Sequence, residues 1–189
     1  ELASQIAKYI ADNRIVDIIF GNMEFGPRAL CNTSSIFLPR AELTAENNAN
    51  NLRNEVMPCA PICTNENASK LFNAEELNRV IGSDRFMICT HTYKKPYSRL
   101  YAGAMHEKTL SVGPDYTGRP QIVKNGSFMW HILNAVERIC DAKCLVNTSF
   151  NVHGNPIVFD SADIISNYKF QCEHAKMNGT EKPILIIIK

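Results

Sequence analysis

The most constraining stretch of this sequence is an apolar run that ends abruptly at a glycine-containing turn. Residues 15–20, Ile-Val-Asp-Ile-Ile-Phe, have the composition of a strand, and Gly21 follows them directly. Gly21 and Gly26 can adopt backbone conformations that other residues avoid, and Pro27 suits the first position of a helix. We therefore expect a strand, a tight turn and a new helix, in that order.

This turn would present Glu24 and Arg28 close to the unpaired amide groups of the new helix. A guanidinium group beside free N–H groups is a favourable place for a phosphate. The spacing alone also fits an ordinary strand–turn–helix corner with a surface arginine, so both interpretations stay open at this point.

Composition and charge exclude several classes of protein. The chain has 189 residues, 45% hydrophobic and 21% charged, which is enough for one compact domain with a core. The net charge is +1, whereas nucleic-acid binders usually carry a basic excess, so we expect no nucleic-acid partner. The longest apolar run, Ile184 to Ile188, predicts a buried strand and is too short to span a membrane. Because the chain starts at Glu1 without a signal-peptide pattern, we expect a fragment of a longer protein.

Seven cysteines occur without tight pairing motifs, which is typical of reduced thiols in a cytoplasmic protein. The pairs Cys59/Cys63 and Cys140/Cys144 are each four residues apart. A structural zinc site is the alternative, but such sites usually show closer, repeated spacing, so small buried thiols are the preferred interpretation and no metal ligands are assigned.

Strands that alternate with helices predict an α/β domain without repeats or a flexible linker. Helical spacing or capping residues indicate helices over 2–12, 66–80, 127–141 and 160–170. The asparagine-rich segment 44–55 fits an exposed polar helix or loop. Further strands are expected over 86–90, on both sides of a polar loop within 143–158, and at 184–188.

The polar loop within 143–158 carries Ser149 and Asn151 on alternate residues. A hydroxyl and an amide in this arrangement can point to the same side and bind phosphoryl or carbamoyl oxygens without adding charge. As a bare pattern, Asn-Thr-Ser clusters also mark turns. Earlier in the chain, Arg53 precedes the proline-rich Pro58–Pro61, whose stiffness would hold the guanidinium at a fixed angle.

Four segments resemble, in the same order, the C-terminal YrdC-like domain of the O-carbamoyltransferase family of nodulation and antibiotic-tailoring proteins. They are Met23–Leu30, Arg53–Pro61, Ala104–His106 together with Gly118–Gln121, and Asn147–Val158. Ser149-x-Asn151 is also similar to the Ser-x-Asn half of the Lys-x-Arg/Ser-x-Asn tetrad of the wider YrdC and Sua5 group. The resemblance implies a twisted mixed sheet flanked by helices, with a concave, positively lined cleft, over residues 1–189.

The resemblance also implies an activity. The family's domain uses ATP and carbamoyl phosphate to form a carbamoyl-adenylate, and a preceding Kae1-like domain transfers the carbamoyl group to an acceptor hydroxyl. The implied catalytic residues are Arg28, Arg53, Ser149 and Asn151. The implied nucleotide-binding set adds Glu24, His106, Arg119, Asn147 and Gly154, with Mg²⁺ held mainly through the nucleotide phosphates. We expect Arg28 and the Ser149/Asn151 pair to face one another across a shared hollow.

Several cationic positions of the family pattern are neutral here. The family has an arginine at the positions occupied here by Asn22, Thr33 and Met57, and a lysine at the position of Asn51. It also has a glutamate at the position of Asn155. Each lost charge-assisted contact costs about 1.5–3 kcal/mol in a closed site, so we expect weaker or altered nucleotide handling unless Lys94, Lys95 or Lys108 compensates. The alternative is a divergent nucleotide- or RNA-binding module that keeps the fold without activating carbamate, and a purely structural role would leave Arg28 and Ser149/Asn151 unexplained.

Overall fold

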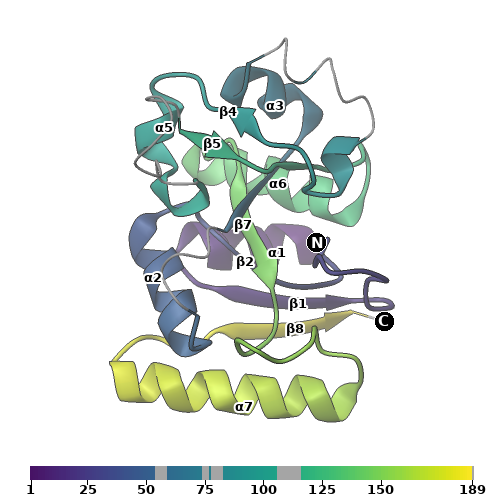
Figure 1. The fold of residues 1–189 in the computed structure, drawn as a ribbon, viewed down its shortest axis with the longest axis vertical. Coiled ribbons are helices and arrows are strands. Elements are labelled where there is room, and N and C mark those ends of the chain that lie inside the picture. Colours follow the sequence, from purple (N-terminus) through teal and green to yellow (C-terminus); the bar gives the residue numbers. More distant parts are fainter. Residues whose placement is uncertain (54–58, 74–76, 78–82, 106–115, 189) are drawn as a thin grey trace.

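The computed structural model describes residues 1–53, 59–73, 77, 83–105 and 116–188, which form an α/β fold (Figure 1). The helices are α1 Leu2–Ala11, α2 Ala41–Asn50, α3 Asn65–Leu71, α5 Tyr97–Leu100, α6 Phe128–Cys140 and α7 Ser161–Asn178, with 3₁₀ turns at Ser83–Arg85 and Ala102–Ala104. The strands are β1 Val16–Phe20, β2 Thr33–Phe37, β3 Ala60–Cys63, β4 His91–Thr92, β5 Thr117–Gly118, β6 Gln121–Ile122, β7 Leu145–Ser149 and β8 Ile184–Ile188.

Six of these strands form one mixed sheet in the order β6-β3-β7-β2-β1-β8. The outer pairs β3–β6 and β1–β8 are parallel, and the three inner pairs are antiparallel. Strands β2 and β7 therefore lie at the centre, although more than a hundred residues separate them in the chain. The strands β4 and β5 form a separate antiparallel pair.

One face of the main sheet is covered by α1 and α6, which also pack against each other (Figure 1). The helices contribute Ile6 and Ile132 to the main hydrophobic core, and the strands contribute Val16, Ile18 and Ile36. All five side chains are fully buried. The apolar stripes of the two helices thus find their partner in one side of β1 and β2.

The opposite face of β1 and β8 packs against α7, which runs alongside β8 (Figure 1). A smaller core joins Ile19 and Phe150 to Ile164 and Tyr168 of α7. Helix α2 contacts α7 at one side of the sheet. A third core, which includes Phe72 and Tyr93, lies in the part of the molecule built from α3, α5, β4 and β5.

The predicted capping residues are confirmed at the starts of the two longest helices, α6 and α7. Ser127 accepts a hydrogen bond from the Trp130 N–H at the start of α6, and Asp160 accepts from two amides at the start of α7. The predicted helix over 2–12 and the predicted strands at 15–20 and 184–188 are also confirmed. Helix α7 continues to Asn178, beyond the expected end at Phe170, until Gly179 ends it in a left-handed conformation.

Three predicted elements are wrong. Residues 86–90 form no strand, because Met87 has a positive φ and the chain enters β4 only at His91. The segment after Gly154 forms no second strand either, since residues 155–159 are irregular. The predicted continuous helix over 66–80 is interrupted, because α3 ends at Leu71 and residues 72–73 are not helical. Leu77 is helical, and residues 74–76 and 78–80 of the predicted helix lie outside the described residues.

Two predictions about exposure are also wrong. The segment 44–55 contains the end of α2, but its side chains Asn47, Asn48, Asn50 and Asn51 are buried against the rest of the molecule. The side-chain oxygens of Asn51 and Asn50 accept hydrogen bonds from Gln171 and Asn178 on α7, whereas Nδ2 of Asn47 and Oδ1 of Asn48 have no partner among the described groups. Strand β8 is an edge strand and is only half-buried.

All seven cysteines are free thiols. Within the described ranges, no helix combines the length and apolar character that crossing a membrane requires.

Candidate functional site

The turn between β1 and β2 contains no helix, so the expected helix after Pro27 is wrong. Its backbone is organised by the carboxylate of Glu24, which is nearly buried. Oε1 accepts hydrogen bonds from the N–H groups of Leu30 (2.6 Å), Asn32 (2.7 Å) and Thr33 (3.2 Å). Oε2 accepts from the Thr33 hydroxyl at 2.5 Å. The Glu24 carboxylate thus accepts from backbone N–H groups that would have been paired within the predicted helix. The predicted ligand Glu24 therefore lies inside the turn, with both carboxylate oxygens hydrogen-bonded to the turn itself.

The second half of this turn is held against β7. The Asn147 side-chain amide donates to the Ala29 carbonyl (3.1 Å) and to Oε1 of Gln121 (2.6 Å). The Gln121 amide donates in turn to the Leu30 carbonyl (3.1 Å), and the Cys31 thiol donates to Gln121 Oε1 (3.3 Å). We call Cys31, Gln121 and Asn147, with these two carbonyl groups, the turn cluster. Its buried side chains are uncharged at neutral pH, since burial strongly raises the pKa of the Cys31 thiol.

Two guanidinium groups flank the turn cluster. Arg28 is exposed immediately before Ala29, and Arg119 is half-buried two residues before Gln121. Arg119 has a lowered pKa, first because of burial and second because of the positive charge of Arg28. The two cations are therefore close enough to repel each other, and an anion between them would relieve that repulsion.

A second cluster surrounds Arg53. Its guanidinium donates to the Thr148 hydroxyl, to the carbonyl (2.6 Å) and hydroxyl (2.9 Å) of Ser149, and to the carbonyl (3.2 Å) and side-chain oxygen (2.8 Å) of Asn151. We call Arg53, Thr148, Ser149 and Asn151 the arginine cluster. The structure thus joins three of the sequence-predicted residues, although Arg53 precedes the other two by almost a hundred positions.

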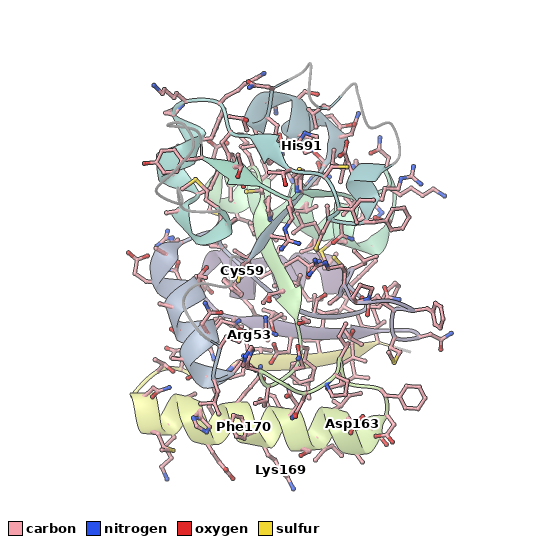
Figure 2. All side chains as sticks on the ribbon, in the orientation of Figure 1. Arg53, Cys59, His91, Asp163, Lys169 and Phe170 are labelled. Carbon is pink, nitrogen blue, oxygen red and sulfur yellow. The ribbon has the colours of Figure 1, made fainter. Side chains whose placement is uncertain are left out.

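The chain reaches this position by a sharp change of direction after α2. Leu52 adopts a left-handed conformation with φ 53°, and the Arg53 N–H donates to the Asn48 carbonyl at 2.8 Å. In Figure 2, Arg53 lies between α2 and the end of β7. Burial lowers the pKa of the Arg53 guanidinium, whereas the negative charge of Asp17 raises it.

The family's lysine position is occupied by Asn51, which faces away from solvent and is 1% exposed. Its amide donates to the Asn47 carbonyl (2.9 Å), and its side-chain oxygen accepts from Gln171 of α7 (3.0 Å). Asn51 therefore connects α2 to α7 as a neutral structural residue, and a lysine ammonium could not replace it without losing these contacts.

The two clusters are connected through β2. Ser34 is the register partner of Ser149, and its hydroxyl accepts from the Cys31 N–H at 3.0 Å. Asn147 and Thr148 are consecutive residues of β7, so their side chains point to opposite sides of the sheet. Arg28 precedes Ala29, whose carbonyl accepts from Asn147, two residues before Ser149. A hollow shared by Arg28 and the Ser149/Asn151 pair stays a prediction.

Sequence reasoning missed one charged residue near this site. Asp17 lies in the middle of β1 with its side chain fully buried. One carboxylate oxygen accepts from the Ser35 hydroxyl at 2.5 Å, and the other makes no hydrogen bond to any described group. Burial raises the pKa of Asp17 to about 7, partly offset by Ser35 and by the charge of Arg53. The sequence did contain a signal for this residue, since Asp17 is the one charged residue within the apolar run 15–20.

The remaining predicted residues are placed as follows. His106 and Met57, and the candidate compensating residue Lys108, lie outside the described residues. Gly154 lies in the exposed loop after Asn151 with φ 86°, a conformation that favours glycine. The Asn151 amide donates to the backbone carbonyl of Asn155 at 2.7 Å. The Lys94 ammonium donates to the Ser69 carbonyl at 2.8 Å.

These residues fit a polyanionic ligand better than a protein-bound metal. Arg28 makes no hydrogen bond or ion pair with any described residue, and Oδ1 of Asn147 is buried without a partner among them. Across the described ranges, no three histidine, cysteine or acidic side chains are grouped as metal ligands would be. Guanidinium groups beside hydroxyl and amide donors are suited to phosphate oxygens.

A family model for the carbamoyltransferase C-terminus matches residues 7–178. The chain therefore belongs to the carbamoyltransferase C-terminal family, as its motifs predicted. It is 28% identical over 172 residues to nodulation protein NolNO of Sinorhizobium fredii and 25% identical over 166 residues to the 3'-hydroxymethylcephem-O-carbamoyltransferase of Amycolatopsis lactamdurans. These alignments cover 89% and 85% of this chain but only 24% and 29% of the relatives.

Solved structures support the same architecture. Full-length HypF in a phosphate- and nucleotide-bound form matches 99% of this chain, and 25% of its own, with a TM-score of 0.64 and 15% identity. Sua5 of P. abyssi complexed with L-threonine matches 97% of this chain, and 46% of its own, with a TM-score of 0.61 and 10% identity. At these identities the likeness shows the fold, which is YrdC-like as predicted.

Proposed function

We propose that this domain activates carbamoyl phosphate with ATP to form a carbamoyl-adenylate. A preceding Kae1-like domain of the same protein would then transfer the carbamoyl group to an acceptor hydroxyl. The observation that carries the proposal is the direct hydrogen bonding of Arg53 to Ser149 and Asn151. The cephem O-carbamoyltransferase relative and the nucleotide-bound HypF structure support the same class of chemistry.

In this proposal, residues 1–189 act as one YrdC-like unit whose task is positioning and charge neutralisation. Water first hydrolyses carbamoyl phosphate to carbamate and inorganic phosphate, which leaves. The carbamate oxygen then attacks the α-phosphorus of ATP, and the bond between the α-phosphorus and the pyrophosphate leaving group breaks in line with the attack. Arg28, Arg53 and Arg119 supply charge-assisted contacts to the phosphate oxygens. Arg53 also holds Ser149 and Asn151, which orient the carbamate and the α-phosphate. Mg²⁺ is assigned to the phosphate oxygens. The seven free thiols support a cytoplasmic setting for this reaction.

The test measures binding and chemistry separately. ATP with Mg²⁺ and carbamoyl phosphate is titrated into the protein by calorimetry, and pyrophosphate release is followed in parallel. We expect millimolar or tighter binding and slow pyrophosphate release that requires carbamoyl phosphate. If millimolar ATP produces no heat of binding, the nucleotide-dependent function is wrong.

A pair of matched arginine variants locates the binding. Arg28→Ala should weaken ATP binding about tenfold, because one charge-assisted contact with a phosphate is lost. Arg138→Ala is the control, since Arg138 is exposed in the last turn of α6, outside both clusters. Equal weakening by both variants would show that net charge alone explains the binding.

A second candidate is a nucleotide-binding module without carbamate activation. The observation in its favour is Asn51, which places a buried neutral amide where the family has a lysine. Under this alternative, ATP binds but pyrophosphate release stays at the background rate with carbamoyl phosphate present. The pyrophosphate measurement therefore separates the two candidates directly.

A further inference from the structure

A row of polar side chains crosses the centre of the sheet from Asp17 to Arg53. Asp17 on β1 is the register partner of Ser35 on β2, and Ser35 is the register partner of Thr148 on β7. These three side chains therefore point to the same face of the sheet, on three neighbouring strands. The Ser35 hydroxyl donates to Asp17 at 2.5 Å, and the Thr148 hydroxyl accepts from Arg53.

The two ends of this row carry opposite charges with little else to neutralise them. Asp17 is 0% exposed, and its second carboxylate oxygen has no hydrogen-bond partner among the described groups. Arg53 makes its printed hydrogen bonds to uncharged oxygens of Thr148, Ser149 and Asn151. The charges of Asp17 and Arg53 stabilise each other, although the two groups are not in an ion pair.

Two other titratable side chains near this pair, Tyr168 and Cys59, are neutral at pH 7, and the charged Arg14, which lowers the pKa of Tyr168, is paired with Glu181. Tyr168 approaches Asp17 from α7, and burial together with Cys172 raises its pKa to about 12. The charge of Arg53 also acts on the Cys59 thiol, whose pKa is raised by burial. On the neighbouring strands, the row contains Leu185 of β8 and Ser35 of β2, which do not titrate in this range. Arg53 is therefore the charged group that responds to the ionisation of Asp17.

We propose that Asp17 is a buried positioning residue for Arg53, and that an anion binding at Arg53 is taken up together with a proton on Asp17. An arriving anion adds negative charge near Asp17 and competes with it for the positive charge of Arg53. The negative charge of the Asp17 carboxylate is then less well neutralised by Arg53, so protonation of Asp17 becomes more favourable. By linkage, anions bind more tightly below the midpoint of the Asp17 titration than above it.

The coupling is testable without a nucleotide. The protein is labelled with ¹³C at aspartate carboxyl groups, and the Asp17 signal is followed by NMR from pH 5 to pH 9. In Arg53→Gln we expect the midpoint to rise by at least about half a pH unit, because a stabilising positive charge is lost. Arg119→Gln is the control, and its Asp17 midpoint should stay at the wild-type value. An unchanged midpoint in Arg53→Gln overturns the coupling.

The second part of the test uses sulfate, because its charge does not change over this pH range. The inference rests on the proposed anion-binding role of Arg53, so wild-type protein is titrated with sodium sulfate, with sodium chloride at equal ionic strength as the control. We expect sulfate to shift the Arg53 side-chain signals and to raise the Asp17 midpoint by about half a unit. Movement of the Arg53 signals without a change in the Asp17 midpoint overturns proton uptake.

The two measurements keep the failures apart. If sulfate does not bind but Arg53→Gln raises the Asp17 midpoint, the charge coupling stands and the anion-binding role of Arg53 is wrong, together with proton-coupled uptake. If Arg53→Gln does not fold, the wild-type sulfate titration decides, and an unchanged Asp17 midpoint overturns the inference. Asp17→Asn, which keeps the shape and an acceptor for Ser35, should in addition remove the pH dependence of sulfate affinity between pH 6 and pH 8.

Discussion

The turn cluster and the arginine cluster are built on consecutive residues of the same strand, yet they differ in how they handle charge. The turn cluster uses neutral amides, a thiol and backbone carbonyls inside, with Arg28 and Arg119 outside it. The arginine cluster has its cation inside, held by hydroxyl and amide oxygens, with a buried carboxylate two strands away.

This difference separates two tasks. A neutral hydrogen-bond network fixes backbone geometry. The turn cluster therefore holds the backbone next to Arg28 in place, while the charge of Arg28 itself takes no part in these hydrogen bonds. The arginine cluster holds a half-buried cation in place, so the electrostatic free energy of this cluster depends on what charge lies beside Arg53. The following variants test this contrast, from the largest expected effect to the smallest.

Arg53→Ala should have the largest effect, because it removes five hydrogen bonds and leaves their partly buried acceptors without this donor. We expect a loss of about 3–5 kcal/mol in the free energy of unfolding and at least a hundredfold weaker ATP binding. Urea denaturation and calorimetry measure the two quantities. Arg53→Lys keeps the charge but not the planar fork, so it should recover only part of both losses. Full recovery by lysine would contradict the geometric role.

Asp17→Asn should stabilise the protein at alkaline pH. The folded-state pKa of about 7 lies above the ordinary value of 3.8, so the folded protein binds the proton more tightly than the unfolded chain. The wild-type free energy of unfolding should therefore fall between about pH 4 and pH 7 and then level off. The asparagine variant lacks this loss and should be more stable by on the order of 3 kcal/mol at pH 8.

Urea denaturation at several pH values measures this difference. The advantage of the asparagine variant should shrink toward zero near about pH 3, below the ordinary pKa of 3.8, where Asp17 is mostly protonated in both the folded and the unfolded state. An advantage that does not change with pH would show that packing, not the buried charge, is responsible.

Asn147→Ala tests the neutral cluster. It removes the donor to the Ala29 carbonyl and to Gln121, and we expect a loss of about 2 kcal/mol that does not depend on pH between 5 and 8. ATP binding should weaken as well, because the turn that carries Arg28 is less well fixed. Denaturation at three pH values and calorimetry provide the measurements, with the exposed Asn125→Ala as control.

Glu24→Gln should produce the smallest change. The glutamine side chain keeps one carbonyl acceptor but replaces the other oxygen, which accepts from the Thr33 hydroxyl, by an amide donor. The hydroxyl can rotate to accept, so we expect a loss of about 1 kcal/mol, with ATP affinity within about threefold of wild type. A complete loss of ATP binding with unchanged stability would instead place Glu24 in direct contact with the ligand.

Much of the fold followed from local signals. The apolar run of β1, the helical stripe of α6 and the caps Ser127 and Asp160 specify their elements through short-range sterics and hydrogen bonds. The strands predicted over 86–90 and after Gly154 are wrong, because β-rich composition cannot distinguish a strand from an apolar loop packed on a core.

The sequence by itself determined the family, the helices with clear caps, and the residue types suited to phosphate. Only the tertiary structure decided that Glu24 organises its turn, that the asparagines of α2 are buried against α7, and that Arg53 binds Ser149 and Asn151. It also revealed Asp17 two strands away from the arginine cluster. The physical reason is that strand pairing joins residues about a hundred positions apart, and burial then changes which of their charges can be tolerated.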